Sequence, residues 1–258
     1  MRIARFSADD GVAYGVVDGE PGAETVTRIA GLPFGDIQLT GQPRPLVDVR
    51  LVAPVLPSKI VAVGRNYADH AAELGNDVPA EPLIFLKPST SVIGQNEPIM
   101  YPGELSGRVD YEGELAVIIG RVCRQLPAER AAEVIFGYTC ANDVTARDLQ
   151  KSDPQWTRGK GFDTFCPLGP WITTELDTSD LAISTTLSGE VKQSARTSQF
   201  IFGIPHLISY ITQVMTLLPG DVILTGTPAG VGPMQVGDQV TVSVDGIGTL
   251  TNRVVDRD

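Results

Sequence analysis

Short runs of aliphatic and β-branched residues, each ended within a few positions by a turn signal, recur along most of the chain. Gly (27) and Pro (19) are numerous and dispersed through the 258 residues. Both residue types interrupt regular structure and mark turns. The pattern favours many short strands over a helical bundle, and the irregular spacing of the few helical patterns argues against a regular βαβ series. We expect an α+β chain, mostly β, with a mixed and largely antiparallel sheet core.

A soft boundary falls near residue 52, and the length suits one well-cored domain with a small appendage. Residues 1–52 are expected to form a small N-terminal β region, and residues 53–258 the main domain. Residues 31–46 are rich in Pro and Gly, which predicts a linker or a surface loop. The first region carries three strand patterns: Arg2–Phe6, Val12–Val17 and Thr25–Ile29.

The main domain combines strand patterns with three helix patterns. The predicted helices are Asn66–Leu74, Pro127–Phe136 and Pro205–Leu218. Asn66 is expected to cap the first of them. The predicted strands are Ile60–Val63, Leu83–Leu86, Val109–Ile119, Tyr138–Asn142 and Asp221–Leu224, with hairpins at Leu181–Leu187/Glu190–Gln193 and Val240–Val244/Gly248–Val254.

Charge and composition exclude several functions. The net charge is -11, and no basic patch is dense enough for nucleic acid. An anionic membrane surface would repel this chain, and no apolar run reaches the length of a membrane span. The three cysteines show no C-x-x-C spacing, which is typical of reduced thiols. With no apolar signal region at the start, we expect a cytoplasmic location, and an anionic substrate would need a metal or local cations.

The run from Val109 to Gly120 carries the sharpest chemical signal. Glu112 and Glu114 lie at i and i+2 in a strand-like segment, so their side chains point to one face. Two like charges on one face are costly unless something neutralises them, and a divalent cation does so. Taken alone, the pair would more often be a solvated strand end.

A third carboxylate follows the next strand pattern. Asp143 ends that strand and can also cap a short following helix, which is its structural alternative. Together with the two glutamates it predicts a three-carboxylate oxygen site. Oxygen ligands without histidine suit Mg²⁺ or Mn²⁺ rather than Zn²⁺.

Two further segments carry candidate catalytic groups. His70 and Glu73 lie at i, i+3 on a predicted helix, so the carboxylate can orient the imidazole as a general base; an exposed polar pair is equally compatible. Lys160 lies between two glycines, where it can meet a substrate carboxylate or be an ordinary solvated lysine. Residues 224–232 resemble an anion-binding turn after a strand, and a plain turn is the alternative.

Six motifs occur in one order and together resemble the fumarylacetoacetate hydrolase family over residues 55–258. They are G-R-N-Y-A-D-H, F-L-K-P-S, Y-E-G-E-L-A-V-I-I-G, A-N-D-V-T-A-R-D-L-Q, W-T-x-G-K-G-F-D and I-L-T-G-T-P-A-G-V-G. The resemblance implies a mixed β-sandwich roll and, commonly, a homodimer. It implies Mg²⁺ or Mn²⁺ on Glu112, Glu114 and Asp143, with a His70–Glu73 dyad on a segment that orders over the substrate. By the same resemblance, Lys160 joins the dyad as a catalytic residue, and five residues are placed near the substrate or around the metal ligands: Arg65, Tyr67, Arg147, Gln150 and Thr227.

One departure from the namesake enzyme is visible. Here Arg65 and Asn66 precede Tyr67, where the namesake carries an Asp before its Tyr and a longer spacing to its His. The short form is more similar to acylpyruvate hydrolases, oxaloacetate decarboxylases and hydroxyheptadienedioate isomerases.

The resemblance therefore implies an enzyme acting on a small anionic 2-oxo or 2-hydroxy-enoic acid. It would hydrolyse a C–C bond or decarboxylate through a metal-stabilised enolate. The isomerase of 2-hydroxyhepta-2,4-diene-1,7-dioate is an alternative. A second alternative is a catalytically idle, metal-stabilised binding protein, against which the joint presence of His70, Glu73 and Lys160 argues.

Overall fold

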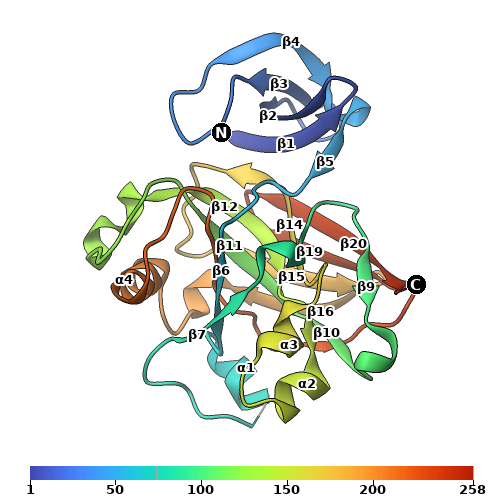
Figure 1. The fold of residues 1–258 in the computed structure, drawn as a ribbon, viewed down its shortest axis with the longest axis vertical. Coiled ribbons are helices and arrows are strands. Elements are labelled where there is room, and N and C mark those ends of the chain that lie inside the picture. The colour runs from blue at the N-terminus through green and yellow to red at the C-terminus, as the bar shows by residue number, and fades with distance from the viewer. Residues whose placement is uncertain (74, 258) are drawn as a thin grey trace.

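The computed structural model describes residues 1–258 apart from Leu74 and Asp258, and strands dominate it (Figure 1). Its α-helices are α1 (Ala68–Glu73), α2 (Arg147–Ser152), α3 (Thr157–Gly161) and α4 (Ile204–Val214). Its strands are β1 (Arg2–Ala8), β2 (Gly11–Asp18), β3 (Thr25–Ile29), β4 (Leu39–Pro45), β5 (Arg50–Val52), β6 (Ile60–Gly64), β7 (Leu83–Lys87), β8 (Val92–Ile93), β9 (Ile99–Tyr101), β10 (Val109–Tyr111), β11 (Gly113–Ile119), β12 (Ile135–Asn142), β13 (Thr145–Ala146), β14 (Cys166–Thr173), β15 (Ala182–Leu187), β16 (Glu190–Arg196), β17 (Val222–Leu224), β18 (Gly232–Pro233), β19 (Gln239–Val244) and β20 (Gly248–Asp256). Short 3₁₀ turns complete the list: η1 (Leu46–Asp48), η2 (Ser89–Ser91), η3 (Gly103–Leu105), η4 (Ala128–Glu133) and η5 (Thr197–Gln199). The predicted mostly-β class is confirmed.

The strands form a mixed, largely antiparallel arrangement, as expected. The largest sheet runs β4-β3-β2-β1-β14-β12-β11-β17-β6-β7, with β5 and β8 attached. A five-stranded sheet runs β16-β15-β19-β20-β9, and a three-stranded sheet runs β13-β10-β18. Parallel pairing joins β17 to β6, β14 to β8 and β20 to β9.

The main core lies between the two larger sheets. Val117 of β11 belongs to the same buried cluster as Val242 of β19 and Ile183 of β15. Helix α4 covers this cluster with Leu207 and Ile211. Face-to-face burial of alternate strand residues is the packing expected of a sandwich. Among the described residues, no helix is long and apolar enough to cross a membrane.

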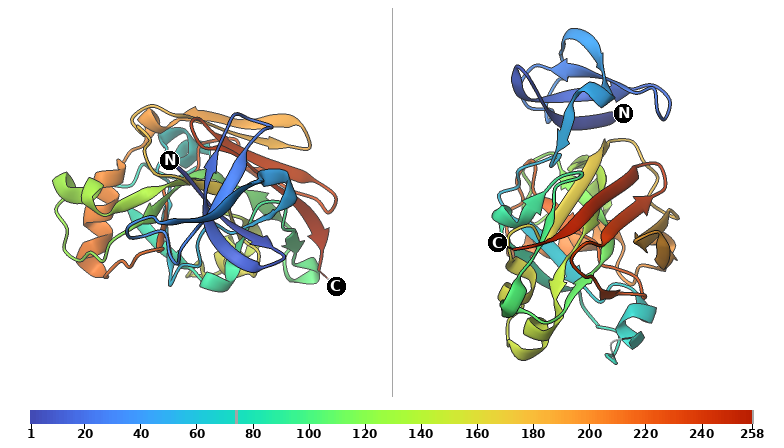
Figure 2. Two further views of the ribbon diagram at one scale, coloured as in Figure 1. Left: turned by 90° about the horizontal axis from the view of Figure 1, so that it is seen from above. Right: turned by 90° about the vertical axis from the view of Figure 1, so that its right-hand side faces the viewer.

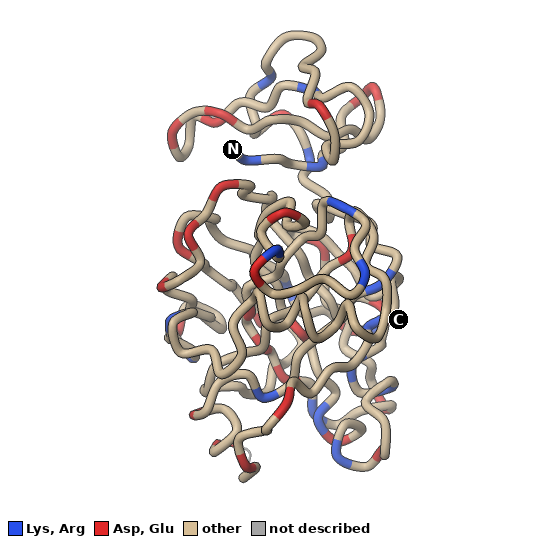
Figure 3. Tube along the Cα trace, turned by 90° about the vertical axis from the view of Figure 1, so that its left-hand side faces the viewer, with Lys and Arg blue, Asp and Glu red and all other residues tan. Residues whose placement is uncertain are grey.

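The N-terminal strands form a separate layer above the main body in Figure 1 and in the right-hand view of Figure 2. They have a small core of their own, which includes Phe6 and Val26. In the part of the chain described, one strand pairing joins these strands to the main body. It lies between β1 and β14 and pairs Arg2 with Thr173 and Ile3 with Ile172. Acidic positions are spread over both parts of the molecule (Figure 3).

Residues 31–46 were expected to be a linker or loop, and that prediction is wrong in part. Strand β4 lies within them and pairs with β3, at Ile29 with Leu39 and at Arg28 with Thr40. Every residue of β4 is exposed. A strand with no buried face has no alternation of apolar and polar residues, so the sequence pattern could not reveal it.

The predicted strand Val109–Ile119 is two strands. β10 ends at Tyr111 and β11 begins at Gly113, and the two belong to different sheets. Glu112 lies at the junction. The break leaves Glu112 outside any sheet ladder, while β11 continues into the core. The three carboxylates predicted to bind a metal converge at this break.

Helix boundaries were less well predicted. The first helix begins at Ala68, and Leu74 is outside the described residues. Asn66 does not cap it; its side chain donates to the carbonyls of Phe202 and Thr225 instead. The second predicted helix is the 3₁₀ turn η4, after which β12 begins at Ile135. α4 ends at Val214 rather than at residue 218. At Asn66, tertiary hydrogen bonds therefore replace the expected capping contact.

Candidate active site

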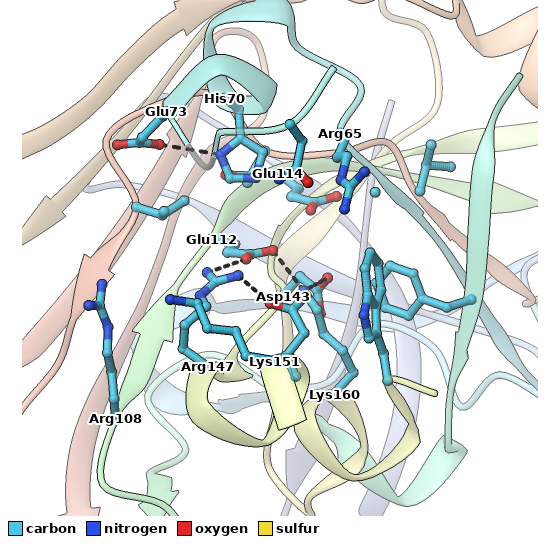
Figure 4. A pocket seen from close by; sticks show the side chains of 18 residues that line it. Arg65, His70, Glu73, Arg108, Glu112, Glu114, Asp143, Arg147, Lys151 and Lys160 are labelled. Atoms are coloured by element: carbon cyan, nitrogen blue, oxygen red, sulfur yellow. Dashed lines mark hydrogen bonds and ion pairs between the residues drawn. The ribbon is translucent and has the colours of Figure 1, made fainter. Parts of the chain in front are cut away.

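A cavity of about 520 Å³ opens beside the β10–β11 junction (Figure 4). Its walls come from α1, α2, α3, the residues after β6 and β12, and the loop after β17. Every site residue predicted from the sequence lines it except Tyr67: Arg65, His70, Glu73, Glu112, Glu114, Asp143, Arg147, Gln150, Lys160 and Thr227. The fold therefore collects residues that are far apart in the sequence around one space.

Three carboxylates converge on the inner end of this cavity. One oxygen from each of Glu112, Glu114 and Asp143 lies within 4.8 Å of the others, and all three residues are buried. Strand pairing explains the convergence. β11 runs antiparallel to β12, with Glu114 opposite Ala141, and the Asp143 amide donates to the Glu112 carbonyl at 2.8 Å. Asp143 does not cap a helix, because α2 begins only at Arg147.

Three buried cations surround these carboxylates. The Lys160 ammonium bridges Glu112 Oε2 (2.8 Å) and Asp143 Oδ2 (2.6 Å). Lys87 donates to the other oxygen of Asp143, at 2.6 Å. Arg147 donates to Glu112 Oε1 at 2.6 Å. Buried charges of one sign require such partners, because desolvation is costly.

Asp110 completes the charge balance. It is fully buried and accepts hydrogen bonds from Arg147 Nε at 2.9 Å and from Arg108 Nε at 2.8 Å. Asp110, Glu112 and Asp143 are thus matched by the three buried cations Lys87, Lys160 and Arg147. Glu114 is the carboxylate left over.

The two glutamates consequently differ in their affinity for protons. Burial would raise the pKa of Glu112, but the charges of Lys160 and Arg147 outweigh burial and hold it below its ordinary value. Burial and the charges of Asp143 and Glu112 raise the pKa of Glu114 well above 4.5. Among the described residues the only hydrogen-bond donor to the Glu114 carboxylate is the Gly226 amide, at 2.6 Å to Oε2. Burial lowers the pKa of Lys160, but Asp143 and Glu112 outweigh burial and raise it, so its amine stays charged.

These residues fit a divalent cation. Glu114 is a buried carboxylate with a single amide donor, and two other carboxylate oxygens lie within 4.8 Å of it. A divalent ion would supply the positive charge that Glu114 lacks. The all-oxygen donor set suits Mg²⁺ or Mn²⁺. With such an ion, the four buried carboxylates (Asp110, Glu112, Glu114 and Asp143) and the three buried cations would together carry one net positive charge. That charge favours an anionic ligand.

The predicted dyad lies across the cavity from Arg147 (Figure 4). His70 is 4% exposed, and its Nδ1 is 3.4 Å from Glu73 Oε2. Glu73 in turn accepts the Gly230 amide, at 3.0 Å to Oε1. The loop that resembles an anion-binding turn therefore binds the protein's own carboxylates: Gly226 binds Glu114 and Gly230 binds Glu73.

The residues expected near the substrate occupy different settings. Arg65 lines the cavity from a positive-φ position (φ 57°). Gln150 Oε1 accepts from Arg147 Nη1 at 2.6 Å. Thr227 donates to the Gly113 carbonyl and accepts from the Gln193 amide, so its hydroxyl holds the loop to β11. Tyr67 is buried against Phe200 outside the cavity lining, and burial and the charge of Glu114 raise its pKa.

Several residues that the fold brings to the site had no role in the prediction from the sequence. Lys87 was visible only as part of the F-L-K-P-S motif, and Asp110 only as a neighbour of the glutamate pair. Arg108 and Lys151 line the cavity, as does Trp156, whose ring packs edge-on against Phe85. A fully buried lysine or aspartate carries no sequence signal of its burial, because both types are mostly exposed.

Comparison with known protein families identifies the class. The model described as "Fumarylacetoacetate (FAA) hydrolase C-terminal" matches residues 59–255. A second model, "Rv2993c-like, N-terminal", matches residues 1–54. This chain belongs to the fumarylacetoacetate hydrolase family, and the resemblance drawn from its motifs is confirmed.

Known relatives match most of this chain. The chain is 56% identical to Protein Rv2993c of Mycobacterium tuberculosis, covering 99% of this chain and 98% of the relative. It is 42% identical to oxaloacetate tautomerase YisK of Bacillus subtilis, covering 81% of this chain and 74% of that protein.

Solved structures share the fold over the full length. A structure named 5-carboxymethyl-2-hydroxymuconate delta-isomerase, from Mycobacterium smegmatis, is 53% identical, with a TM-score of 0.94 and 100% of both chains covered. A maleylpyruvate hydrolase from Sphingobium sp. SYK-6, in complex with manganese(II) and pyruvate, is 34% identical, with a TM-score of 0.82 and 100% of both chains covered. The relatives are thus named for tautomerase, isomerase and hydrolase reactions.

Proposed function

We propose that this chain is a divalent-metal-dependent enzyme that moves a proton or a double bond next to the 2-oxo group of a small anionic carboxylic acid. The reaction is of the oxaloacetate tautomerase or 2-hydroxy-dienoate isomerase type and passes through an enolate. One observation carries the proposal: three buried carboxylates with oxygens within 4.8 Å of one another line a cavity that also holds a carboxylate-oriented histidine. The names of the relatives support it.

Glu112, Glu114 and Asp143 would hold Mg²⁺ or Mn²⁺, which supplies Lewis-acid stabilisation of an enolate oxygen when bound. Arg147 and Lys160 fix the oxygens of Glu112, so this carboxylate keeps one orientation. Lys160 remains an ammonium and would add positive charge beside the substrate carboxylate that lies next to the 2-oxo group. His70 faces the cavity with its ring oriented by Glu73. It would take the proton from the carbon next to the 2-oxo group and return it at a different position.

C–C bond hydrolysis is the second candidate, and the same dyad favours it. His70 with Glu73 could activate water instead of a carbon-bound proton. The manganese-bound maleylpyruvate hydrolase, at 34% identity, supports this reading. Decarboxylation of an oxaloacetate-like acid needs the same enolate but no activated water, so it would depend less on His70.

Turnover of three compounds separates these reactions. The protein would be stripped with EDTA, reloaded with Mg²⁺ or Mn²⁺, and given enol-oxaloacetate, acetylpyruvate and 2-hydroxyhepta-2,4-diene-1,7-dioate. Metal-dependent interconversion of enol and keto forms, or a double-bond shift, with the highest kcat/KM supports the proposal. Faster cleavage of acetylpyruvate supports hydrolysis. Absence of metal-dependent turnover for all three contradicts both and favours a binding protein.

A matched pair of variants ties the activity to the metal candidates. Glu114→Gln keeps the side-chain size but removes the charge, and it should abolish metal-dependent turnover. Glu104→Gln makes the same change at an exposed position outside the cavity and should leave turnover intact.

We also propose a homodimer, by resemblance to the family; a monomeric mass in solution at micromolar concentration would contradict it.

A further inference from the structure

One lysine of this chain stands apart from the others. The sequence has five lysines, and Lys151 is the one that makes no ion pair or hydrogen bond with any residue that the structure describes. It is exposed, and it lines the cavity. In a chain of net charge -11, an uncompensated cation at this place is a local exception to the repulsive field. The paired lysines are Lys59 with Asp221, Lys87 with Asp143, Lys160 with Glu112 and Asp143, and Lys192 with Glu190.

Helix α2 directs Lys151 toward the cavity. Arg147, Gln150 and Lys151 lie at i, i+3 and i+4, which places them on one helix face, and all three line the cavity. The Arg147 amide donates to the Arg108 carbonyl at 2.8 Å, so Arg108 flanks the start of this face. Figure 4 shows Arg108 and Lys151 on the same side of the metal-candidate carboxylates, with Arg65 on the opposite side.

Arg108 also has capacity for a ligand. Its Nε and Nη2 donate to Asp110, at 2.8 and 3.2 Å, and no described residue accepts a hydrogen bond from its Nη1. Half of its side chain is exposed. Asp110 is shared with Arg147 and therefore does not neutralise Arg108 fully.

The two cations beside the candidate metal ligands already donate hydrogen bonds to protein groups. Arg147 is engaged by Asp110, Glu112 and Gln150, and Lys160 by Glu112 and Asp143. They can serve the end of a substrate that approaches the metal. A second anionic group, further along the substrate, would need donors that the protein has not used.

We propose that Lys151 and Arg108 form a subsite for the carboxylate remote from the 2-oxo group, so that the enzyme selects 2-oxo dicarboxylates over 2-oxo monocarboxylates of equal length. The assignment rests on the proposed function and deepens it by naming the specificity-determining residues. Charged donors suit this task, because their hydrogen bonds to carboxylates are the stronger ones.

Two stable ligands of equal carbon number test the subsite without turnover. 2-Oxoglutarate and 2-oxopentanoate differ only in the terminal carboxylate, and calorimetric titration of the Mg²⁺-loaded protein measures both affinities. The wild-type protein should bind 2-oxoglutarate more tightly. Lys151→Met should weaken 2-oxoglutarate about tenfold, as expected for loss of one hydrogen bond to a charged group, and leave 2-oxopentanoate unchanged. Arg108→Gln should act in the same direction.

The control is Arg253→Gln, which makes the same change in net charge at an exposed residue of β20 outside the cavity. It should alter neither affinity. Equal binding of the two ligands, binding of neither, or equal loss of both in Lys151→Met would overturn the subsite. So would a preference that Arg65→Met removes and Lys151→Met leaves intact. If no 2-oxo acid is turned over but the Lys151-dependent preference persists, the proposed reaction fails and the subsite stands.

Discussion

The Gly230 amide donates a hydrogen bond to Glu73, 157 residues earlier in the chain, at 3.0 Å to Oε1 and 3.2 Å to Oε2. Glu73 also lies 3.4 Å from His70 Nδ1. The candidate base on α1 is therefore oriented by a carboxylate that the loop after β17 holds from the other side. The loop and the helix are therefore connected through Glu73, although sequence spacing links only His70 with Glu73.

Gly230→Ala should disrupt this connection. Gly230 has a φ of +98°, and a Cβ there would lie 2.1 Å from the Lys192 carbonyl oxygen, so the loop must shift at the residue whose amide binds Glu73. We expect kcat to fall about tenfold or more, since misplacement near the reacting groups is costly. Gly237→Ala is the matched control, with a φ of +97° and no atom within 4 Å of the added Cβ. It should lose about 1 kcal/mol of stability from backbone strain and keep kcat. Equal kcat values for the two variants would refute the orienting role of Gly230.

His70→Ala tests the proton-transfer role. Loss of a general base should reduce kcat about 10²- to 10⁴-fold in tautomerisation, isomerisation or hydrolysis. Metal affinity measured by calorimetry should hardly change, because His70 is not among the clustered carboxylates. His206→Ala removes the only other histidine, an exposed residue on α4, and should have no effect on kcat. If only decarboxylation of oxaloacetate survives in His70→Ala, no proton transfer by this residue is needed for that reaction.

The class of fold and the pairing of Glu112 with Glu114 could be predicted from the sequence because both depend on local patterns. The hairpins at Ser188-Gly189 and Asp245-Gly246 were predicted by turn residues and are present as β15–β16 and β19–β20. The Glu112–Glu114 spacing brought both side chains into one cluster even though the strand breaks at Glu112. β4 could not be foreseen, since its residues are exposed throughout and only pairing with β3 defines it.

The rest of the site depends on long-range contacts. Lys87 donates a hydrogen bond to Asp143, which lies 56 positions later in the sequence. Asn66 was expected to cap a helix, but its side chain donates to the carbonyls of Phe202 and Thr225. No spacing rule connects such residues. Tyr67 illustrates the converse: its motif suggested a substrate contact, whereas its ring packs against Phe200, and its role stays a prediction.

Asp110→Asn tests the buried charge balance. Asp110 is fully buried and accepts from both Arg108 and Arg147, so the variant leaves the buried Arg147 with one charged partner fewer. Breaking a buried pair by removing one partner costs about 3–5 kcal/mol, and urea unfolding should show a loss approaching that size. Glu133→Gln breaks the exposed Arg130–Glu133 pair and should not change the unfolding midpoint measurably. A similar midpoint for both variants would show that Asp110 is dispensable to the balance.

Metal binding should depend on pH through Glu114. Burial and its neighbouring carboxylates raise the pKa of Glu114, so the folded protein without metal retains a proton that the unfolded chain releases near the ordinary value of 4.5. By linkage, this group's contribution to stability is complete below the unfolded pKa and is lost as pH rises through the raised folded value. A divalent ion must displace that proton, so its affinity should increase with pH and its binding should release about one proton. The rise in melting temperature on adding Mg²⁺ should therefore be larger at about pH 8 than at about pH 5, and proton release should show as a dependence of calorimetric enthalpy on the buffer. Glu114→Gln should bind the ion more weakly by over about 100-fold and lose the proton release. A stabilisation by Mg²⁺ that is the same at both pH values would mean that Glu114 is already ionised before the ion binds.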